Sequence, residues 1–428
     1  MLRSVNDYIN AGLTHSLHTS ERRSFRGCRR RWDWISRQMY YPRVTARPLE
    51  FGVAFHAAME AYYGFWLGLW ENPDPEAALQ LALIKFREIT DSQRAAYIRM
   101  NDEISPEMSA DYKDRVKLGE SMLKYYFRTI APKADMDLKP LKVEIKFEVP
   151  ITGPNGETLW CKCDHCWARY TNWWLSKRPE PLGGVDPEQE RAHWKGLPVT
   201  YGGRIDIIFQ DRYGRIWVGD WKTAARLSGV DTNTTDDYMW NDDQITSYCW
   251  ALASIGLDVA GFIYAEIKKA VPEEPELLSR PYKGRMFSTN KQQTTTLALF
   301  RNTVSENDVE AYESGAYDDF LEYLKHNAPQ FHARHQIHRN DEELRQAGEM
   351  IYLEATEMTN PSLPIYPNPG RFHCKGFTDA SGCAFWEPCL GKNRGEDYEY
   401  TLETMFEKRT RHYWEEAQPS TDKRMEAL

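Results

Sequence analysis

The segment that most constrains the fold is GRIDIIFQDRYGRIWVGDWKT, residues 203–223. Apolar and β-branched residues on both sides of the turn sequence DRYG predict a strand, a tight turn and a second strand. Charged residues interrupt these apolar strands at Asp206, Asp220 and Lys222. Because side chains alternate along a strand, Asp220 and Lys222 project from the same face. A β-hairpin that carries a polar site is therefore the first expectation.

The register of this hairpin decides whether its charged residues meet. If Ile208 pairs with Val218, Asp206 lies directly opposite Asp220, whereas a slip of one residue removes the convergence. Adjacent carboxylates repel each other unless a cation neutralises them, and hard oxygen ligands favour magnesium or manganese. The pattern thus predicts a metal site in which Lys222 orients or activates a water and offsets developing negative charge.

Helical and strand patterns surround the hairpin. KVEIKFEVPI before it and GFIYAEIKK after it are strand-like, and the first half of the chain is mainly helical. Helices are expected over residues 20–40 (with Ser20 as N-cap), 51–70, 75–100, 107–130, 241–256, 305–328 and 339–357. This alternation of types predicts an α/β fold.

Two pairs of polar residues recur at helical spacing. His56 and Glu60 share a face of the apolar helix, and Gln244 and Tyr248 share a face of the helix after the hairpin. Taken alone, a histidine on an apolar helix is more often a core residue than a ligand. The order of these pairs along the chain is more specific than either pair.

The succession from GVAFHAAME through GRIDII and DWK to QITSY resembles the RecB-like branch of the PD-(D/E)xK nuclease superfamily, including CRISPR-associated and AddB-type nucleases. The resemblance implies a restriction-endonuclease-like fold, a central mixed sheet flanked by helices. It implies metal ligation by His56, Asp206, Asp220 and the backbone carbonyl of Trp221, with Lys222 catalytic alongside the two aspartates. Gln244 and Tyr248 match a QxxxY motif that contacts substrate or supports the site. Either Glu144 or Glu148 is expected in a supporting position on the preceding strand.

The eight cysteines suggest metal ligation, because clustered cysteines in a reducing compartment rarely form disulfides. Cys28 precedes the expected nuclease core, and Cys374, Cys383 and Cys389 follow it. This arrangement resembles the four-iron four-sulfur cluster that joins the two ends of RecB-like nucleases. The family usually has two residues between the second and third cysteines, whereas eight intervene here. A structural zinc site and unliganded buried cysteines stay open as alternatives.

A second cysteine group lies in WCKCDHCW, within a Trp-rich segment at about 155–200 that looks like an insertion. Cys161, Cys163 and Cys166, with His165 or His193, are candidate ligands of a structural zinc ion. The alternative is a reduced cysteine cluster in a loop whose tryptophans, Trp173, Trp174 and Trp194, pack on the core or meet single-stranded DNA. Cys249 is expected only to pack within its helix.

The charge distribution bears on nucleic-acid binding. With 54 basic and 63 acidic residues the net charge is −9, which argues against a protein that coats nucleic acid indiscriminately. Arginines near the N-terminus are nevertheless interleaved with aromatics, a mixture suited to phosphates and stacked bases; they are Arg22, Arg23, Arg26, Arg29, Arg30, Arg31, Arg37, Arg43 and Arg47. Arg29, Arg30 and Arg31, directly after Cys28, agree with the resemblance. The alternative is a solvated basic helix packed through its aromatics.

These features predict four parts: an N-terminal helical section (1–135), a nuclease core (136–270) with the insertion, a helical section ending in the cysteine cluster (271–391), and a charged tail (392–428). The expected activity is magnesium- or manganese-dependent DNA hydrolysis, exonucleolytic on ends or single strands, in replication, recombination or repair. Such a free-standing nuclease would suit a phage or prokaryote. The alternatives are an endonuclease, a nuclease of CRISPR adaptation, and a non-catalytic iron-sulfur subunit that binds DNA ends.

Partners and location follow from what the sequence lacks. No GxxxxGK[ST] motif is present, so unwinding would need a separate helicase or recombination protein. No run of eighteen apolar residues and no signal-peptide core occur, so no membrane span is expected and the cytoplasm is the expected location.

Overall fold

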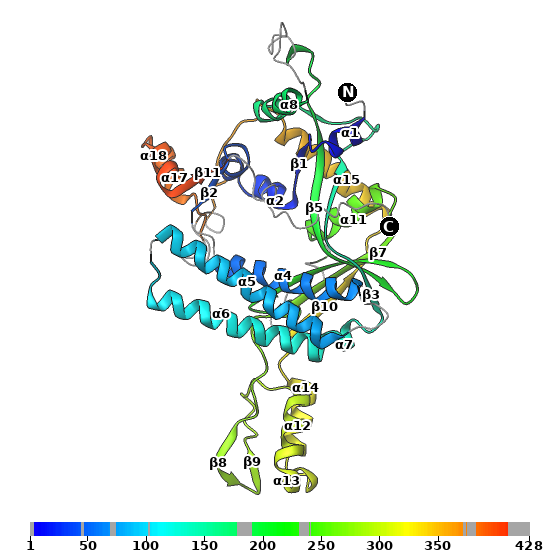
Figure 1. The fold of residues 1–428 in the computed structure, drawn as a ribbon, viewed down its shortest axis with the longest axis vertical. Coiled ribbons are helices and arrows are strands. Elements are labelled where there is room, and N and C mark those ends of the chain that lie inside the picture. The colour runs from blue at the N-terminus through cyan, green and yellow to red at the C-terminus, as the bar shows by residue number, and fades with distance from the viewer. Residues whose placement is uncertain are drawn as a thin grey trace.

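A mixed sheet of seven strands forms the centre of the molecule (Figure 1). The computed structural model describes residues 4–43, 47–68, 74–101, 103–177, 191–230, 239, 241–370, 374 and 382–409. The strands of this sheet are β1 (His15–Leu17), β3 (Leu138–Pro150), β4 (Trp160–Cys161), β5 (Leu197–Asp211), β6 (Ile216–Ala224), β7 (Val259–Lys268) and β10 (His332–Ile337). The expected α/β fold, a central mixed sheet flanked by helices, is confirmed.

The long strand β5 organises the sheet. It runs antiparallel to β3, β4 and β6 and parallel to the short β1. Strand β6 then pairs in parallel with β7, which is antiparallel to β10. Ile208 pairs with Val218, so the hairpin register that the sequence required is confirmed.

Helices cover both faces of the sheet. One layer contains α4 (Arg47–Gly68), α5 (Pro75–Asn101), α6 (Pro106–Tyr125), a π-helical turn (Tyr126–Ile130) and α7 (Ala131–Ala134). The other contains α2 (Thr19–Gly27), α11 (Asp243–Ser254) and α15 (Asp341–Met358). Because strand side chains alternate, Ile207 and Phe209 join the α4–α6 core, whereas Ile208 joins the core beneath α11 and α15.

The N-terminal region is more segmented than the single helix expected over residues 20–40. After α1 (Val5–Asn10) and β1, helix α2 ends at Cys28, whose backbone is extended at φ −164° and ψ 113°. Helix α3 (Arg29–Trp32), a π-helical turn (Asp33–Arg37) and β2 (Tyr40–Pro42) follow. The break at Cys28 interrupts the helix beside a cavity that this residue lines.

The C-terminal region folds back onto this N-terminal region. Helices α17 (Trp386–Arg394) and α18 (Tyr398–Met405) lead into β11 (Phe406–Lys408), which pairs antiparallel with β2. Phe385 stacks on Phe406 with ring centroids 4.3 Å apart, in a small core that includes Trp34. Residues 392–408, expected as part of a charged tail, are therefore folded; residues 410–428 lie outside the described residues.

Two additions extend from the sheet. The insertion before β5 contributes β4 and α8 (Asp164–Ser176). An arm follows β7 and contains β8 (Leu277–Tyr282), β9 (Arg285–Phe287), α12 (Leu297–Asn307), α13 (Val309–Glu313) and α14 (Asp318–Asn327), with its own apolar core (Figure 1). Residues 271–391, expected as one helical section, are thus divided among the arm, β10, α15 and part of the C-terminal region.

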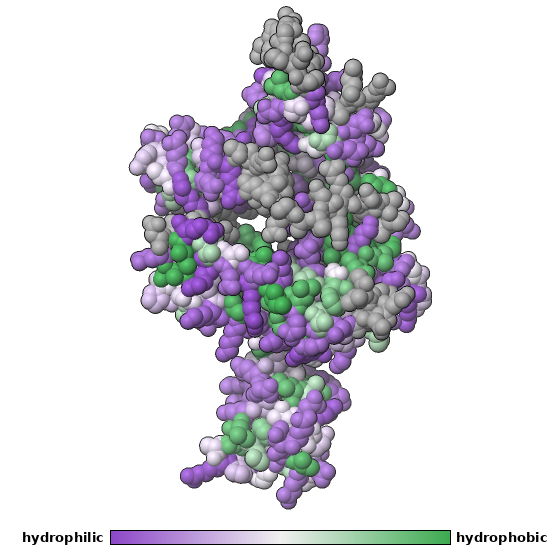
Figure 2. Space-filling view, viewed as in Figure 1, coloured by the Kyte–Doolittle hydropathy of each residue, from purple (hydrophilic) through white to green (hydrophobic). Residues whose placement is uncertain are grey.

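The surface shows no single dominant apolar face in the view of Figure 2, where smaller apolar areas lie over the α4–α6 layer and the arm. Exposed apolar side chains on α4 and α5 include Leu49, Val53 and Ile84. Within the described part of the chain, no helix has both the length and the apolar character needed to cross a membrane.

Candidate active site and cysteine centres

Two neighbouring strands bring the hairpin carboxylates together. The last paired residues toward this end of the β5–β6 ladder are Ile207 and Gly219, and the next position places Asp206 opposite Asp220. The Trp221 N–H donates to the Asp206 carboxylate at 3.0 Å. Both aspartates are buried, with relative exposures of 7% and 4%. The polar site therefore lies where the backbone pairing of β5 with β6 ends and the Asp206 side chain bonds to the β6 backbone.

Lys222 and Gln244 hold Asp220 from two sides. The Lys222 ammonium lies 2.7 Å from one Asp220 oxygen and 2.9 Å from the other, and the Gln244 side-chain amide also donates to this second oxygen, at 3.1 Å. Gln244 reaches the strand because Asp242, the N-cap of α11, accepts from its backbone N–H and starts the helix there. The sequence-predicted Asp220, Lys222 and Gln244 are therefore in direct contact.

His56 and Glu144 complete a ligand group around Asp206. The His56 Nδ1 atom lies 3.2 Å from an Asp206 oxygen, and ligand atoms of His56, Glu144 and Asp206 all lie within 4.8 Å of one another. Glu144 faces Asp206 because Val143 pairs with Ile207 and Ile145 with Ile205. The φ of Glu144 is +47°, an uncommon conformation for a non-glycine residue.

The structure separates the two glutamates that the sequence left open. Glu144 joins the ligand group, whereas Glu148 accepts hydrogen bonds from the hydroxyls of Thr14 and Thr200. The expected ligand set was His56, Asp206 and Asp220 with the Trp221 carbonyl. Asp220 faces Lys222 and lies next to the tight group, and the buried Trp221 ring stacks on Tyr63 at 5.1 Å.

The electrostatics of the group favour a cation. Burial and the neighbouring Asp206 carboxylate raise the pKa of Glu144 to about 8. Burial lowers the pKa of His56, but Asp206 outweighs this effect and the pKa rises to about 9. A divalent ion would relieve the same repulsion, and two carboxylates with one imidazole suit magnesium or manganese. The donor set therefore fits the metal implied by the sequence.

Three further residues border the site. Tyr248 follows Gln244 by one turn of α11 and contacts Phe147 edge to face at 5.1 Å. Glu60 follows His56 by one turn of α4, and its charge contributes to the raised pKa of Glu144. Tyr264, which the sequence analysis did not identify, pairs with Asp220 across β6 and β7. Only the register of the parallel β6–β7 pair could have located it.

The arginine-rich stretch is largely used within the protein. Arg23 and Arg26 form ion pairs with Asp242 and Asp243, at 3.0 and 2.6 Å. Arg22 is fully buried between Glu354 at 2.6 Å and Asp243 at 3.3 Å. The sequence left two interpretations open, a DNA-binding stretch and a basic helix packed within the protein. For Arg22, Arg23 and Arg26, these contacts favour the packed helix.

Replacing the fully buried Arg22 with methionine should destabilise the protein by about 3 kcal/mol, the lower end of the range for a broken buried ion pair, because the partly buried Asp243 and Glu354 keep only Arg26 as a cation. The free energy of unfolding in urea measures this loss. The Arg23→Met variant is a matched control, since Arg23 is 46% exposed and its pair with Asp242 should contribute less than about 1 kcal/mol. Equal losses in the two variants would contradict the structural role of Arg22.

Four distant cysteines line one cavity. Cys28, Cys374, Cys383 and Cys389 border a space of about 450 Å³ that includes solvent-open volume. The Asn368 N–H points at the Cys28 sulfur at 3.4 Å, and the Arg30 guanidinium donates to the Cys389 sulfur at 3.3 Å. Such donors commonly surround metal-bound sulfur. Arg31 also lines the cavity.

The spacing of these four cysteines indicates what they could bind. Among the described residues, the groups whose ligand atoms all lie within 4.8 Å of one another do not include these four cysteines. A single tetrahedral ion needs a tight set, whereas each cysteine of a four-iron cluster binds a different iron. The residues therefore fit a cluster better than one ion. Arg29, expected to support DNA binding, pairs with Glu357 and lies over the Phe25 ring.

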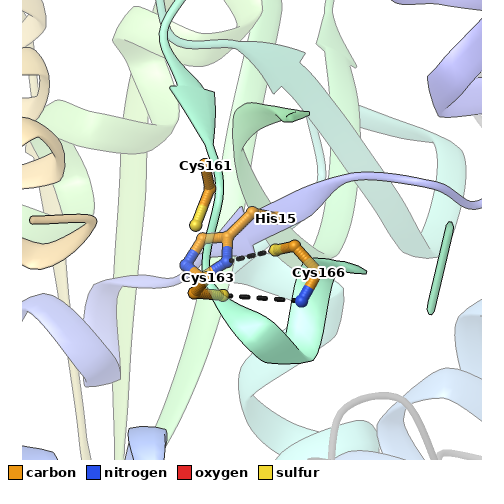
Figure 3. A group of neighbouring side chains, drawn as sticks. All are labelled: His15, Cys161, Cys163 and Cys166. Carbon is orange, nitrogen blue, oxygen red and sulfur yellow. Dashed lines mark hydrogen bonds between the residues drawn. The ribbon is translucent and has the colours of Figure 1, made fainter. Parts of the chain in front are cut away.

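The second cysteine group gathers around a different histidine from those expected. Cys161, Cys163 and Cys166 lie together with His15 of β1 (Figure 3), whereas His165 and His193 were the sequence candidates. Trp194 packs against Trp167 at 5.2 Å, which favours tryptophans that pack on the core. Cys249 is buried within α11, as expected.

One comparison with known proteins covers most of the chain. The family model described as the PD-(D/E)XK nuclease superfamily matches residues 19–390. The match includes both hairpin aspartates, Lys222 and all four cysteines of the cavity. No curated protein gives a significant match to the sequence.

Proposed function

Because the chain belongs to the PD-(D/E)XK nuclease superfamily, whose activity is phosphodiester hydrolysis, we propose that it is a magnesium- or manganese-dependent deoxyribonuclease of the RecB-like branch. The proposed mode is exonucleolytic, on DNA ends or single strands, in replication, recombination or repair. The observation that carries the proposal is the meeting of Asp206, Asp220 and Lys222 with His56 at the end of the β5–β6 ladder.

The residues of the site have different roles in this proposal. Asp206, Glu144 and His56 would hold the ion, with Asp220 beside them. When bound, a divalent ion supplies Lewis-acid polarisation of the phosphoryl group and activation of water. Burial lowers the pKa of Lys222, but Asp220 and Asp206 outweigh it and hold the pKa above its usual range. Lys222 is thus a protonated group that can offset negative charge on the phosphate in the transition state.

Gln244 is a positioning residue in this proposal. Its amide donates to the Asp220 oxygen on which Lys222 also converges, which restricts the carboxylate to one orientation. Tyr248, on the same face of α11, is buried in the core next to the site and packs edge to face on Phe147. The QxxxY pair therefore supports the strand residues that touch substrate.

The four cysteines of the cavity would hold a four-iron four-sulfur cluster in the same proposal. Cys28 comes from the end of α2, and Cys389 comes from α17. A cluster there would add a covalent link to the contacts between β2 and β11. Its expected role is structural, because the cavity is lined by residues of these two regions and by none of the nuclease carboxylates.

The test of this function is degradation of DNA labelled at one end, as linear single and double strands, with magnesium or manganese. We expect stepwise loss of the label from free ends, no cleavage of a closed circle, and loss of activity when both ends are blocked. Cleavage of circles would show an endonuclease. Tight binding of ends with no cleavage under any metal condition would contradict the enzymatic proposal and favour the non-catalytic end-binding subunit.

A further inference from the structure

A second metal-ligand group lies away from the nuclease carboxylates, at the junction of the N-terminus and the insertion. His15 belongs to β1, Cys161 to β4, and Cys163 and Cys166 to the first turn of α8 (Figure 3). One ligand atom from each lies within 4.8 Å of every other, and His15 Nδ1 is 3.2 Å from the Cys166 sulfur. Residues more than 140 positions apart in the chain thus meet at one point.

The donor set indicates which ion would bind. Three sulfurs and one imidazole nitrogen are soft or borderline ligands, which favour zinc over magnesium or calcium. Four protein ligands fill a tetrahedral shell and leave no position open for water, as in structural rather than catalytic zinc sites. Cys161 and Cys166 are buried, so the thiolates would repel one another in a dry environment without a cation.

The backbone around the group holds the ligands in place. The Cys163 sulfur accepts from the Cys166 N–H at 3.5 Å as the N-cap of α8. Arg169, on the same helix, donates to the carbonyls of Thr14 and Gly12 at 2.7 and 2.6 Å, next to His15. Gly196 has a φ of +106°, and a Cβ there would lie 2.7 Å from the Cys161 carbonyl oxygen. The close approach therefore requires glycine at this position.

We propose that His15, Cys161, Cys163 and Cys166 bind one Zn²⁺ ion, which fastens β1 to the insertion. Strand β1 is only three residues long and pairs in parallel with Val199–Tyr201 of β5. So short a strand gains little from its own hydrogen bonds. The zinc ion would anchor it and thereby fix the start of α2, which carries Arg22 and ends at Cys28.

The experiment measures zinc and iron per chain in the full-length protein, purified under reducing conditions. We expect about one zinc per chain in the wild type, its loss in His15→Ala and Cys163→Ser, and its retention in His15→Cys, which offers four thiolates. Cys249→Ala is the matched control, because Cys249 is a buried cysteine outside the group. It should keep its zinc.

Cobalt substitution gives a second readout, which reports the identity of the ligands and not only the metal content. Tetrahedral Co²⁺ with three thiolates absorbs strongly in the visible, and His15→Cys should shift these bands while keeping their intensity. A zinc content equal to that of the wild type in both His15→Ala and Cys163→Ser, or a wild type without zinc, whether or not it holds iron, would overturn the proposal. Nuclease activity is not part of the readout, so the result is independent of the proposed function.

Discussion

Replacing Lys222 with methionine should slow metal-dependent DNA cleavage by about 10²- to 10³-fold, the usual loss when one preorganised charge-stabilising group is removed. The reason is the position of its ammonium, which lies 2.7 Å from Asp220 and is the cation that the two buried aspartates hold protonated. DNA binding should change little, because a single charge contributes a small part of the total phosphate affinity. Single-turnover cleavage at saturating metal, together with a binding assay, measures both.

The control for this prediction is Lys124→Met. Lys124 lies on α6, is 44% exposed against 36% for Lys222, and faces Glu120 rather than the carboxylate group. Its removal should leave the cleavage rate within a factor of about two, as for other surface changes away from a site. Cleavage by Lys222→Met at more than a tenth of the wild-type rate would place the chemistry elsewhere.

Replacing Cys28 with serine should remove the iron-sulfur chromophore and lower the midpoint of thermal unfolding by roughly 4–5 °C. The estimate assumes that the cluster contributes about 4 kcal/mol, and that about 1 °C corresponds to each kcal/mol, since the unfolding entropy of a chain of 428 residues is about 0.9 kcal/mol/K. Without the cluster, the three-residue pairing of β2 with β11 and the Trp34–Phe385 contact would remain between the two regions. Visible absorption and calorimetry of anaerobically purified protein provide the measurement.

The matched comparison for Cys28→Ser is Cys249→Ala. Cys249 is a buried cysteine outside both the His15 group and the Cys28 cavity, so its replacement should leave iron and colour unchanged. Colourless wild-type protein with one zinc among Cys28, Cys374, Cys383 and Cys389 would refute the cluster and support the alternative of a second zinc site.

The convergence of the hairpin residues could be predicted because its signals are local. The DRYG turn indicates the hairpin, and the period of two places Asp220 and Lys222 on one face. The register with Ile208 opposite Val218 was a condition of the convergence, and the strand pairing meets it. The helices that carry His56 and Gln244 were found within a few residues of their ends, because the long apolar run of α4 and the helical pattern after Asp242, the N-cap of α11, are informative.

What the sequence missed depends on contacts between distant segments. His15 sits on a strand of three residues, too short for any periodicity, and only its parallel pairing with β5 brings it to Cys161. The choice between Glu144 and Glu148 required the β3–β5 register. The arginine-rich stretch suggested phosphate binding because composition does not reveal that Asp243 and Glu354 face it.

The dependence of both cysteine groups on distant segments sets an order of events during synthesis. His15 and Cys166 are 151 residues apart, so at about 5–20 residues per second the histidine waits roughly 8–30 s for its partner. Cys389, 359 residues after Arg30, emerges later still. Cys28 must therefore stay reduced until Cys389 has been made, whereas all four residues of the His15 group are present once residue 166 has been added. On the two proposals above, the residues of the zinc site are complete first and those of the cluster last.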